Sequence, residues 1–193
     1  TTTAWLLHED GAKIIALSDS SGGVVNLKGL DIEAALAHKQ MTGKLKGLPS
    51  ADSISNQELL ELKCDILVPA ALENQITAEN ASRIKASIIA EAANAAVTPG
   101  ADEALSKKDC FVIPDILCNA GGVIVSYFEW VQDLQGLFWS EAEVNNQLEK
   151  IMIRSFKEIY EVAQKRKLAM RVAAYVQAVG RVSDATNVRG LFP

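Results

Sequence analysis

Four short apolar runs constrain the fold of this chain more than any other feature. They occupy residues 13–18, 64–68, 87–90 and 110–113. Each run is too uniformly apolar for a strand with one face in water, so we predict strands buried on both faces, as in a parallel sheet. Stretches with a helical pattern alternate with them, at residues 31–39, 56–62, 78–85 and 101–108. This alternation predicts a doubly wound α/β sheet.

The last third of the chain is predicted to be helical. A long amphipathic helix is expected at residues 141–167, with Ser140 as its N-cap. A final helix is expected from Met170 to about Ala185. The chain therefore combines an α/β part with an all-helical tail.

These patterns predict a Rossmann-like domain at residues 1–136 and a helical C-terminal segment at residues 137–193 that packs on it. A short helix around Trp5 precedes the first apolar run directly, without a strand and a Gly-x-Gly-x-x-Gly turn before it. If the domain is of this type, we expect its first strand and its phosphate loop upstream of Thr1.

The composition excludes several classes of function. A formal net charge of −5 argues against a nucleic-acid partner, which would need a basic face. No apolar run approaches the roughly 20 residues of a membrane-spanning helix. Cys64, Cys110 and Cys118 form no Cys-x-x-Cys pair, so neither a zinc site nor a disulfide framework is expected, and a reducing, cytoplasmic setting fits best. With only two histidines, a histidine-based metal site or triad is not expected.

Small and polar residues follow the predicted strands, where open α/β sheets bind their ligands. Asp19 is placed to accept hydrogen bonds from an adenosine ribose, and Ser20 could donate to a 2′-phosphate, so both NAD and NADP are compatible. Ala70 and Ala71 would let a ligand approach the backbone, and Asn94 presents an amide to a ribose hydroxyl. The alternative is that these are ordinary turn residues.

Residues 114–130 are predicted to form one helix, with Asp115 as its N-cap. Gly121 and Gly122 would then lie inside it, where each costs roughly 1 kcal/mol relative to alanine. Such a cost suggests that something approaches the backbone closely. Tight packing against a neighbouring element is the alternative explanation.

One face of that helix carries an unusual set of side chains. Asn119, Val123 and Ser126 are spaced i, i+4 and i+7, so an amide and a hydroxyl lie about 10 Å apart with one apolar residue between them. They form either a ligand-binding stripe or a pair of polar groups satisfied inside the protein.

Several segments together resemble the cofactor domain of glutamate dehydrogenases, in the Glu/Leu/Phe/Val dehydrogenase family. The resemblance covers essentially the whole chain, and its most distinctive part runs from Asn119 to Ser126. It is carried by residues 17–23 (LSDSSGG), 65–77 (DILVPAALENQIT), 91–94 (EAAN), 98–102, 114–136 and the RVAAY tail at 171–175. It implies an enzyme with two domains flanking a cleft, in which NAD or NADP takes a hydride from the α-carbon of an amino acid to give a 2-oxo acid. It also implies a homo-oligomer, a hexamer in the intact family.

The resemblance assigns a role to each cofactor-binding candidate. Asp19 would lie by the adenosine ribose. Ala70 and Ala71 would line the path of the cofactor, and Asn94 would hold the nicotinamide ribose. Asn119 would reach the carboxamide and also the substrate.

On the substrate side, the resemblance implies that Val123 and Ser126 meet the substrate side chain. Ser126 would donate a hydrogen bond to a γ-carboxylate, which distinguishes glutamate from leucine or phenylalanine. A leucine- or phenylalanine-type dehydrogenase is therefore the less favoured reading, because it would call for an apolar residue at position 126.

The departures from the family pattern limit what is expected of this chain. The glycine fingerprint is absent, and the catalytic lysines and aspartate belong to the other domain, so no catalytic residue is assigned here. The Gly-Pro-Thr-Thr that follows the family's asparagine is replaced by residues 95–98 (AAVT). We expect the chain to be inactive alone and, with its helical tail uncovered, to self-associate. A non-catalytic nucleotide-binding or regulatory module remains the alternative function.

Overall fold

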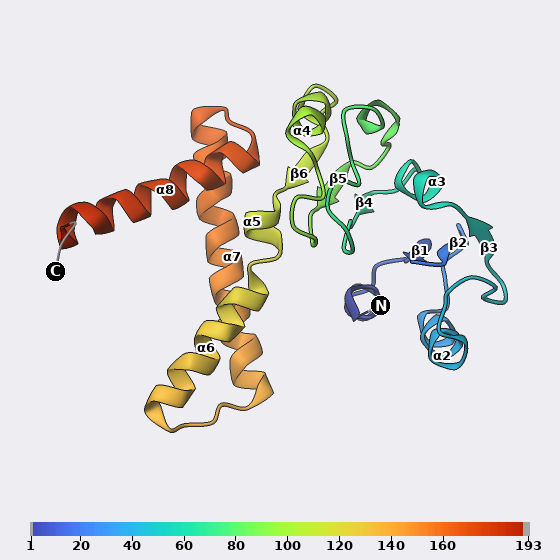
Figure 1. Ribbon diagram of the computed structural model, residues 1–193, viewed down its shortest axis with the longest axis horizontal. Helices are drawn as coiled ribbons and strands as arrows, with labels where there is room; N and C mark the ends of the chain where they lie inside the picture. The colour runs from blue at the N-terminus through green and yellow to red at the C-terminus, as the bar shows by residue number, and fades with distance from the viewer. Residues whose placement is uncertain (1, 191–193) are drawn as a thin grey trace. The chain divides into compact units, whose positions relative to one another are not determined.

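The computed structural model describes residues 2–190, which form two compact units (Figure 1). The first contains the chain up to residue 63 together with residues 83–85, and the second contains residues 64–82 and the chain from residue 86 onward. Each unit has its own three-stranded sheet. Within residues 2–190, no helix combines the length and the apolar composition that a bilayer span requires.

The first unit is built around an antiparallel sheet in the order β1-β2-β3. Its elements are α1 (Thr2–Glu9), β1 (Ala16–Asp19), β2 (Gly22–Val25), α2 (Ile32–Thr42), β3 (Asp52–Ile54) and α3 (Asn56–Leu60). The two predicted helices at 31–39 and 56–62 are confirmed. Asp31 caps α2 by accepting a hydrogen bond from the Ala34 N–H, and Gly43 ends it in the left-handed conformation.

The first apolar run departs from the prediction, because β1 pairs antiparallel with β2 and does not join a parallel sheet. The two-residue turn at Ser20 and Ser21 reverses the chain, and Gly22 follows with φ 127°. Asp19 accepts a hydrogen bond from the Ser21 N–H, which closes the turn. The local turn therefore sets the partner of this strand.

The second unit contains the predicted parallel sheet, in the order β4-β5-β6. Its strands are β4 (Ile66–Leu67), β5 (Ile88–Ala90) and β6 (Phe111–Ile113), which confirms the second, third and fourth apolar runs. Between β5 and β6 lies α4 (Pro99–Ser106), capped by Thr98. The helix predicted at 78–85 is only a 3₁₀ turn, Ala81–Arg83.

A local side-chain hydrogen bond explains why no longer helix forms there. The Asn80 side chain accepts from the Thr77 N–H and donates to the Gln75 carbonyl. Such bonds offer the backbone an alternative to helical pairing.

The helix predicted at 114–130 is interrupted. α5 covers Asp115–Cys118, and α6 begins at Gly121 and ends at Gln135. The two glycines therefore start a helix and do not lie inside one. Pro114, not Asp115, is the N-cap residue of α5, and it makes no side-chain capping bond because it has no polar side chain.

The helical tail forms as predicted. α7 (Glu141–Arg166) starts with a capping box between Ser140 and Glu143, and α8 runs from Met170 to Arg189. α7 contacts both α6 and α8 (Figure 1). Buried side chains of α5, α7 and α8 share one core, made of Leu117, Ile159, Ala163, Met170, Ala173 and Ala174. The domain boundary after residue 136 remains a prediction.

Candidate functional site

The carboxyl ends of β4 and β5 lead into loops that lie side by side. The N–H of Ala93 donates to the Pro69 carbonyl over 2.9 Å, and the N–H of Asn74 donates to the Ala95 carbonyl over 2.8 Å. These bonds place the loop that contains Ala70 and Ala71 along the loop that contains Asn94. Both alanines are exposed.

Two of the predicted site residues are in direct contact. The Asn119 Nδ2 donates a hydrogen bond to the Asn94 Oδ1 over 2.7 Å, across 25 residues of sequence. Asn94 follows β5, and Asn119 is the residue at which α5 ends. In the described part of the chain, the Asn94 Nδ2 and the Asn119 Oδ1 have no hydrogen-bond partner. The pair therefore offers one amide donor group and one acceptor to a ligand.

The remaining residues of the predicted stripe lie on α6 and face water. Val123 is 77% exposed and Ser126 is also exposed, so the alternative in which the Ser126 hydroxyl is satisfied inside the protein is wrong. A Cβ on Gly121 would meet only the Leu148 side chain, at 3.8 Å, and one on Gly122 would meet nothing within 4 Å. Among the described residues of this unit, therefore, no neighbouring element lies close enough to either glycine to require the absence of a side chain.

A largely buried ion cluster adjoins this site, and no sequence pattern predicted it. Arg171, in the first turn of α8, donates to three carboxylates: Asp102 and Asp115, each over 2.9 Å, and Glu91. Glu91 is fully buried. The only sequence signal was a charged residue, Arg171, beside the small apolar residues of the RVAAY segment.

The cluster shifts the pKa values of its members in different directions. Burial raises the pKa of Glu91, although the Arg171 guanidinium and the Val97 N–H oppose this. Burial also acts to raise the pKa of Asp115, but the N–H groups of Ala95 and Ile116 and the guanidinium outweigh it, so the pKa is lowered. Burial disfavours the charged guanidinium, but the neighbouring carboxylates raise the pKa of Arg171.

Asp19 and Ser20 lie in the first unit, and Ser20 is exposed. One Asp19 oxygen accepts from the Ser21 N–H and hydroxyl, and the other accepts from Lys39 Nζ over 2.6 Å and from the Leu45 N–H over 2.9 Å. Burial acts to raise the pKa of Asp19, but these hydrogen bonds outweigh it and hold the pKa well below its usual range. The carboxylate's four acceptor positions are therefore already in use.

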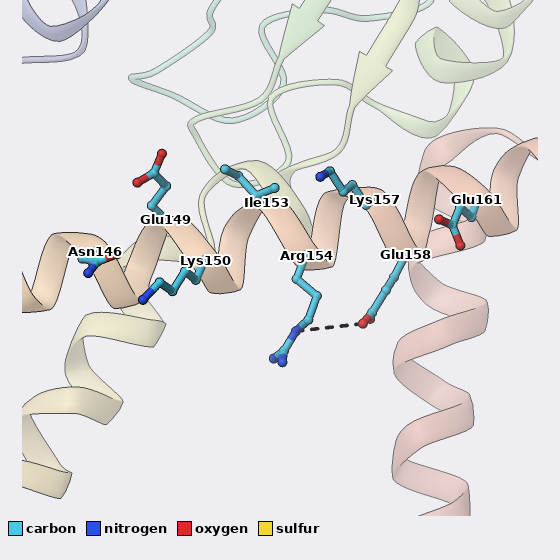
Figure 2. Close-up of a pocket in the computed structure, with 8 residues that line it drawn as sticks. All are labelled: Asn146, Glu149, Lys150, Ile153, Arg154, Lys157, Glu158 and Glu161. Atoms are coloured by element: carbon cyan, nitrogen blue, oxygen red, sulfur yellow. Dashed lines mark ion pairs between the residues drawn. The ribbon is translucent and has the colours of Figure 1, made fainter.

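A hollow of about 580 Å³ lies along α7, apart from the predicted site residues (Figure 2). It is lined by Asn146, Glu149, Lys150, Ile153, Arg154, Lys157, Glu158 and Glu161. Both signs of charge alternate along it, with an ion pair of 3.9 Å between Arg154 and Glu158. These features are typical of a solvated helix face, so we do not regard it as the functional site.

Comparison with known proteins gives a consistent assignment. Residues 1–190 match the model of the Glutamate/Leucine/Phenylalanine/Valine dehydrogenase family. The glutamate dehydrogenase of Thermotoga maritima is 51% identical over 186 residues, 96% of this chain and 45% of that protein. The cryptic catabolic NAD-specific glutamate dehydrogenase GudB of Bacillus subtilis is 50% identical over 187 residues, 97% of this chain and 44% of that protein.

Structural comparison agrees. The crystal structure of the hetero-hexameric glutamate dehydrogenase from Thermus thermophilus, in its Leu-bound form, matches with a TM-score of 0.89 at 33% identity. The match covers 98% of this chain and 45% of that one. This chain thus spans a little under half the length of the relatives that it matches. It belongs to the Glu/Leu/Phe/Val dehydrogenase family.

Proposed function

We propose that this chain is the C-terminal, NAD(P)-binding domain of a glutamate dehydrogenase, the enzyme that interconverts L-glutamate with 2-oxoglutarate and ammonia. The observation that carries the proposal is the hydrogen bond between Asn94, in the loop after β5, and Asn119, at the end of the short helix that follows β6. Both residues follow the carboxyl ends of parallel strands, the edge at which open α/β sheets bind their ligands. Relatives that are named NAD-specific glutamate dehydrogenases support the use of a nicotinamide cofactor.

The residues at this edge fit the nicotinamide half of such a cofactor. In this proposal Asn94 uses its free Nδ2 donors on the nicotinamide ribose, and Asn119 uses its Oδ1 acceptor on the carboxamide. The small side chains of Ala70 and Ala71 leave the backbone of the neighbouring loop accessible. The cofactor accepts the hydride from the substrate α-carbon.

Asp19, in the first unit, is proposed to bind an adenosine ribose. Because its four acceptor positions are occupied, ribose hydroxyls would have to replace the bond from Lys39 or one from Ser21. Exposed Ser20 lies next to Asp19 and is proposed to contact the adenosine ribose or its 2′-phosphate.

Val123 and Ser126 are proposed to contact the substrate side chain. An exposed hydroxyl on α6, without a partner among residues 2–190, is suited to donate a hydrogen bond to the γ-carboxylate of glutamate. A leucine or phenylalanine side chain would leave that hydroxyl unpaired, which disfavours those substrates.

The proton-transfer groups that amine oxidation requires are proposed to come from a part of the enzyme outside this chain. A homo-oligomer of the complete enzyme, with one such domain per subunit, is part of the same proposal. The chain alone is then expected to bind the cofactor weakly and to produce no reduced cofactor.

Two measurements on the purified chain test the proposal. Titration with NAD, followed by NMR, is expected to shift the side-chain amide signals of Asn94 and Asn119. Addition of glutamate with NAD or NADP is expected to give no reduced-cofactor absorbance. The cofactor role is refuted if saturating NAD leaves both amides unchanged, and measurable turnover would refute the assignment of the catalytic groups to another part of the enzyme.

A further inference from the structure

We infer that Arg171 is a positioning residue, which fixes the Asn94–Asn119 pair by holding the carboxylates of Glu91 and Asp115. The inference rests on the proposed function, because it is the nicotinamide-binding role of the pair that makes its position matter.

Arg171 connects four elements of the second unit through one guanidinium. Its Nε donates to Asp102 in α4, its Nη1 to Asp115 at the start of α5, and its Nη2 to Glu91, directly after β5. A planar guanidinium can serve three carboxylates at once, whereas an ammonium is a single point charge. The arginine side chain is only 17% exposed, so these bonds are formed largely out of water.

Two of the three carboxylates use their second oxygen to hold the Asn94 loop. The other oxygen of Glu91 accepts from the Val97 N–H over 3.1 Å, and that of Asp115 accepts from the Ala95 N–H over 2.8 Å. These two carboxylates therefore hold N–H groups of the stretch directly after Asn94, in addition to the backbone bond that the Asn74 N–H donates to the Ala95 carbonyl. Asp115 also begins the short helix α5, which ends at Asn119, so the same cluster orients both members of the pair.

The loop needs this support because its backbone is strained. Ala95 has φ 51°, a left-handed conformation that an alanine adopts only at an energetic cost. Among the described residues, the Asp115 carboxylate is the only hydrogen-bond acceptor for the Ala95 N–H. We therefore expect the loop to relax when Asp115 loses its partner, and Asn94 would move with it.

Charge makes Arg171 indispensable to this arrangement. Three carboxylates surround one guanidinium, and Glu91 has no exposed surface. Removal of the arginine would leave a buried negative charge without compensation, so Glu91 would take up a proton or turn toward water. Either outcome weakens its bond to Val97.

The alternative is that the cluster only attaches α8 to the sheet. That attachment already has an apolar component, because Met170, Ala173 and Ala174 lie in the core shared with α5 and α7. A purely structural role would change the stability of the chain without changing the environment of the two asparagine amides.

The test uses the isotope-labelled chain and nicotinamide mononucleotide, which carries only the nicotinamide and its ribose phosphate. The variants are Arg171→Met, Arg171→Lys and, as the matched control, Arg181→Met. Arg181 lies on the same helix and also pairs with a glutamate, Glu158, over 2.5 Å, but it has no bond to the cluster. The readouts are the Asn94 and Asn119 side-chain signals, the affinity for the mononucleotide, and hydrogen exchange at the Ala95 and Val97 amides.

The expected results separate the two roles. Arg171→Met should displace both asparagine signals, weaken mononucleotide binding about tenfold, and speed exchange at the two amides, while Arg171→Lys should be intermediate. Arg181→Met should match the wild type in all three readouts. If Arg171→Met does not fold, Arg171→Lys alone decides: wild-type signals, affinity and exchange in that variant overturn the inference.

The outcome also separates this inference from the proposed function. If the mononucleotide leaves the wild-type amides unchanged, the proposed function fails, yet exchange at Ala95 and Val97 still shows whether Arg171 holds the loop. If the wild type binds and Arg171→Met binds equally well with unchanged amide signals, the positioning role fails while the proposed function stands.

Discussion

Substitution of Asp19 by asparagine should destabilise the first unit by about 3 kcal/mol at neutral pH. The carboxylate oxygen that faces Lys39 and Leu45 accepts from both, and in the variant an amide donor would face those two donors. Loss of the Leu45 bond to a charged acceptor accounts for about 2 kcal/mol. The Lys39 pair adds only about 0.5 kcal/mol, because the lysine is 34% exposed and screened by water. The unfavourable contact between the asparagine amide donor and these two donors accounts for the remainder of the loss of stability.

The effect should depend on pH with a defined sign. The hydrogen bonds lower the pKa of Asp19 in the folded state, so its contribution is complete above the unfolded-state pKa of about 3.9. As the pH falls below that value, the unfolded chain binds a proton before the folded chain does. The stability difference between wild type and Asp19→Asn should therefore narrow below about pH 4, because a protonated aspartate resembles asparagine.

Urea unfolding followed by NMR signals of Val24 and Ile32, both buried in the core of the first unit, measures this effect where the substitution lies. Asp52→Asn is the matched control, because Asp52 is an exposed aspartate on β3 of the same unit. It should change the free energy of unfolding by less than about 0.5 kcal/mol. A loss below about 1 kcal/mol for Asp19→Asn at pH 7, or a difference that widens in acid, would refute the reasoning.

Three further predictions concern the second unit. Ala95→Gly should raise its free energy of unfolding by about 1 kcal/mol in urea, because glycine adopts the positive φ of Ala95 without strain; a loss of stability would contradict this. Glu91→Gln should remove one component of the pH dependence of stability. Burial raises the pKa of Glu91, so the stability of the wild type should fall as the pH rises from the usual glutamate range through that raised pKa. Urea titrations at several pH values should show this fall in the wild type and not in the variant. If the proposed function holds, Ser126→Ala in the complete enzyme should raise the KM for glutamate about tenfold or more, and Ser126→Thr, which keeps the hydroxyl, should recover part of the loss. Unchanged steady-state kinetics in both variants would exclude the contact.

Local patterns predicted much of the fold because the interactions that decide it are local. The apolar runs at 64–68, 87–90 and 110–113 became parallel strands, and the Ser140 capping box started α7 where expected. The prediction for the first run was wrong because its partner strand is set by the turn that follows, which the hydrogen bond between Asp19 and Ser21 closes. Apolar character indicates burial but does not identify the partner strand.

The candidate site was only partly predictable for a related reason. Asn94 and Asn119 were singled out separately, and their contact follows from the parallel order of β5 and β6. The Arg171 cluster joins residues up to 80 positions apart, and no periodic pattern in a single sequence records such a contact. The break before Gly121 was also missed, because the apolar spacing continues across it.

That break places the proposed cofactor residue Asn119 and the proposed substrate residue Ser126 on different helices, α5 and α6, which both contact α7. Asn119 ends the helix that Asp115 ties to Arg171, while Ser126 lies on the helix that begins at Gly121. If the proposed roles hold, substitutions on α6 can change which amino-acid side chain is bound without altering the residues that bind the nicotinamide. A two-residue interruption of a helix would thus let the same cofactor-binding residues be combined with side chains suited to acidic or to aliphatic substrates, in a family named for both.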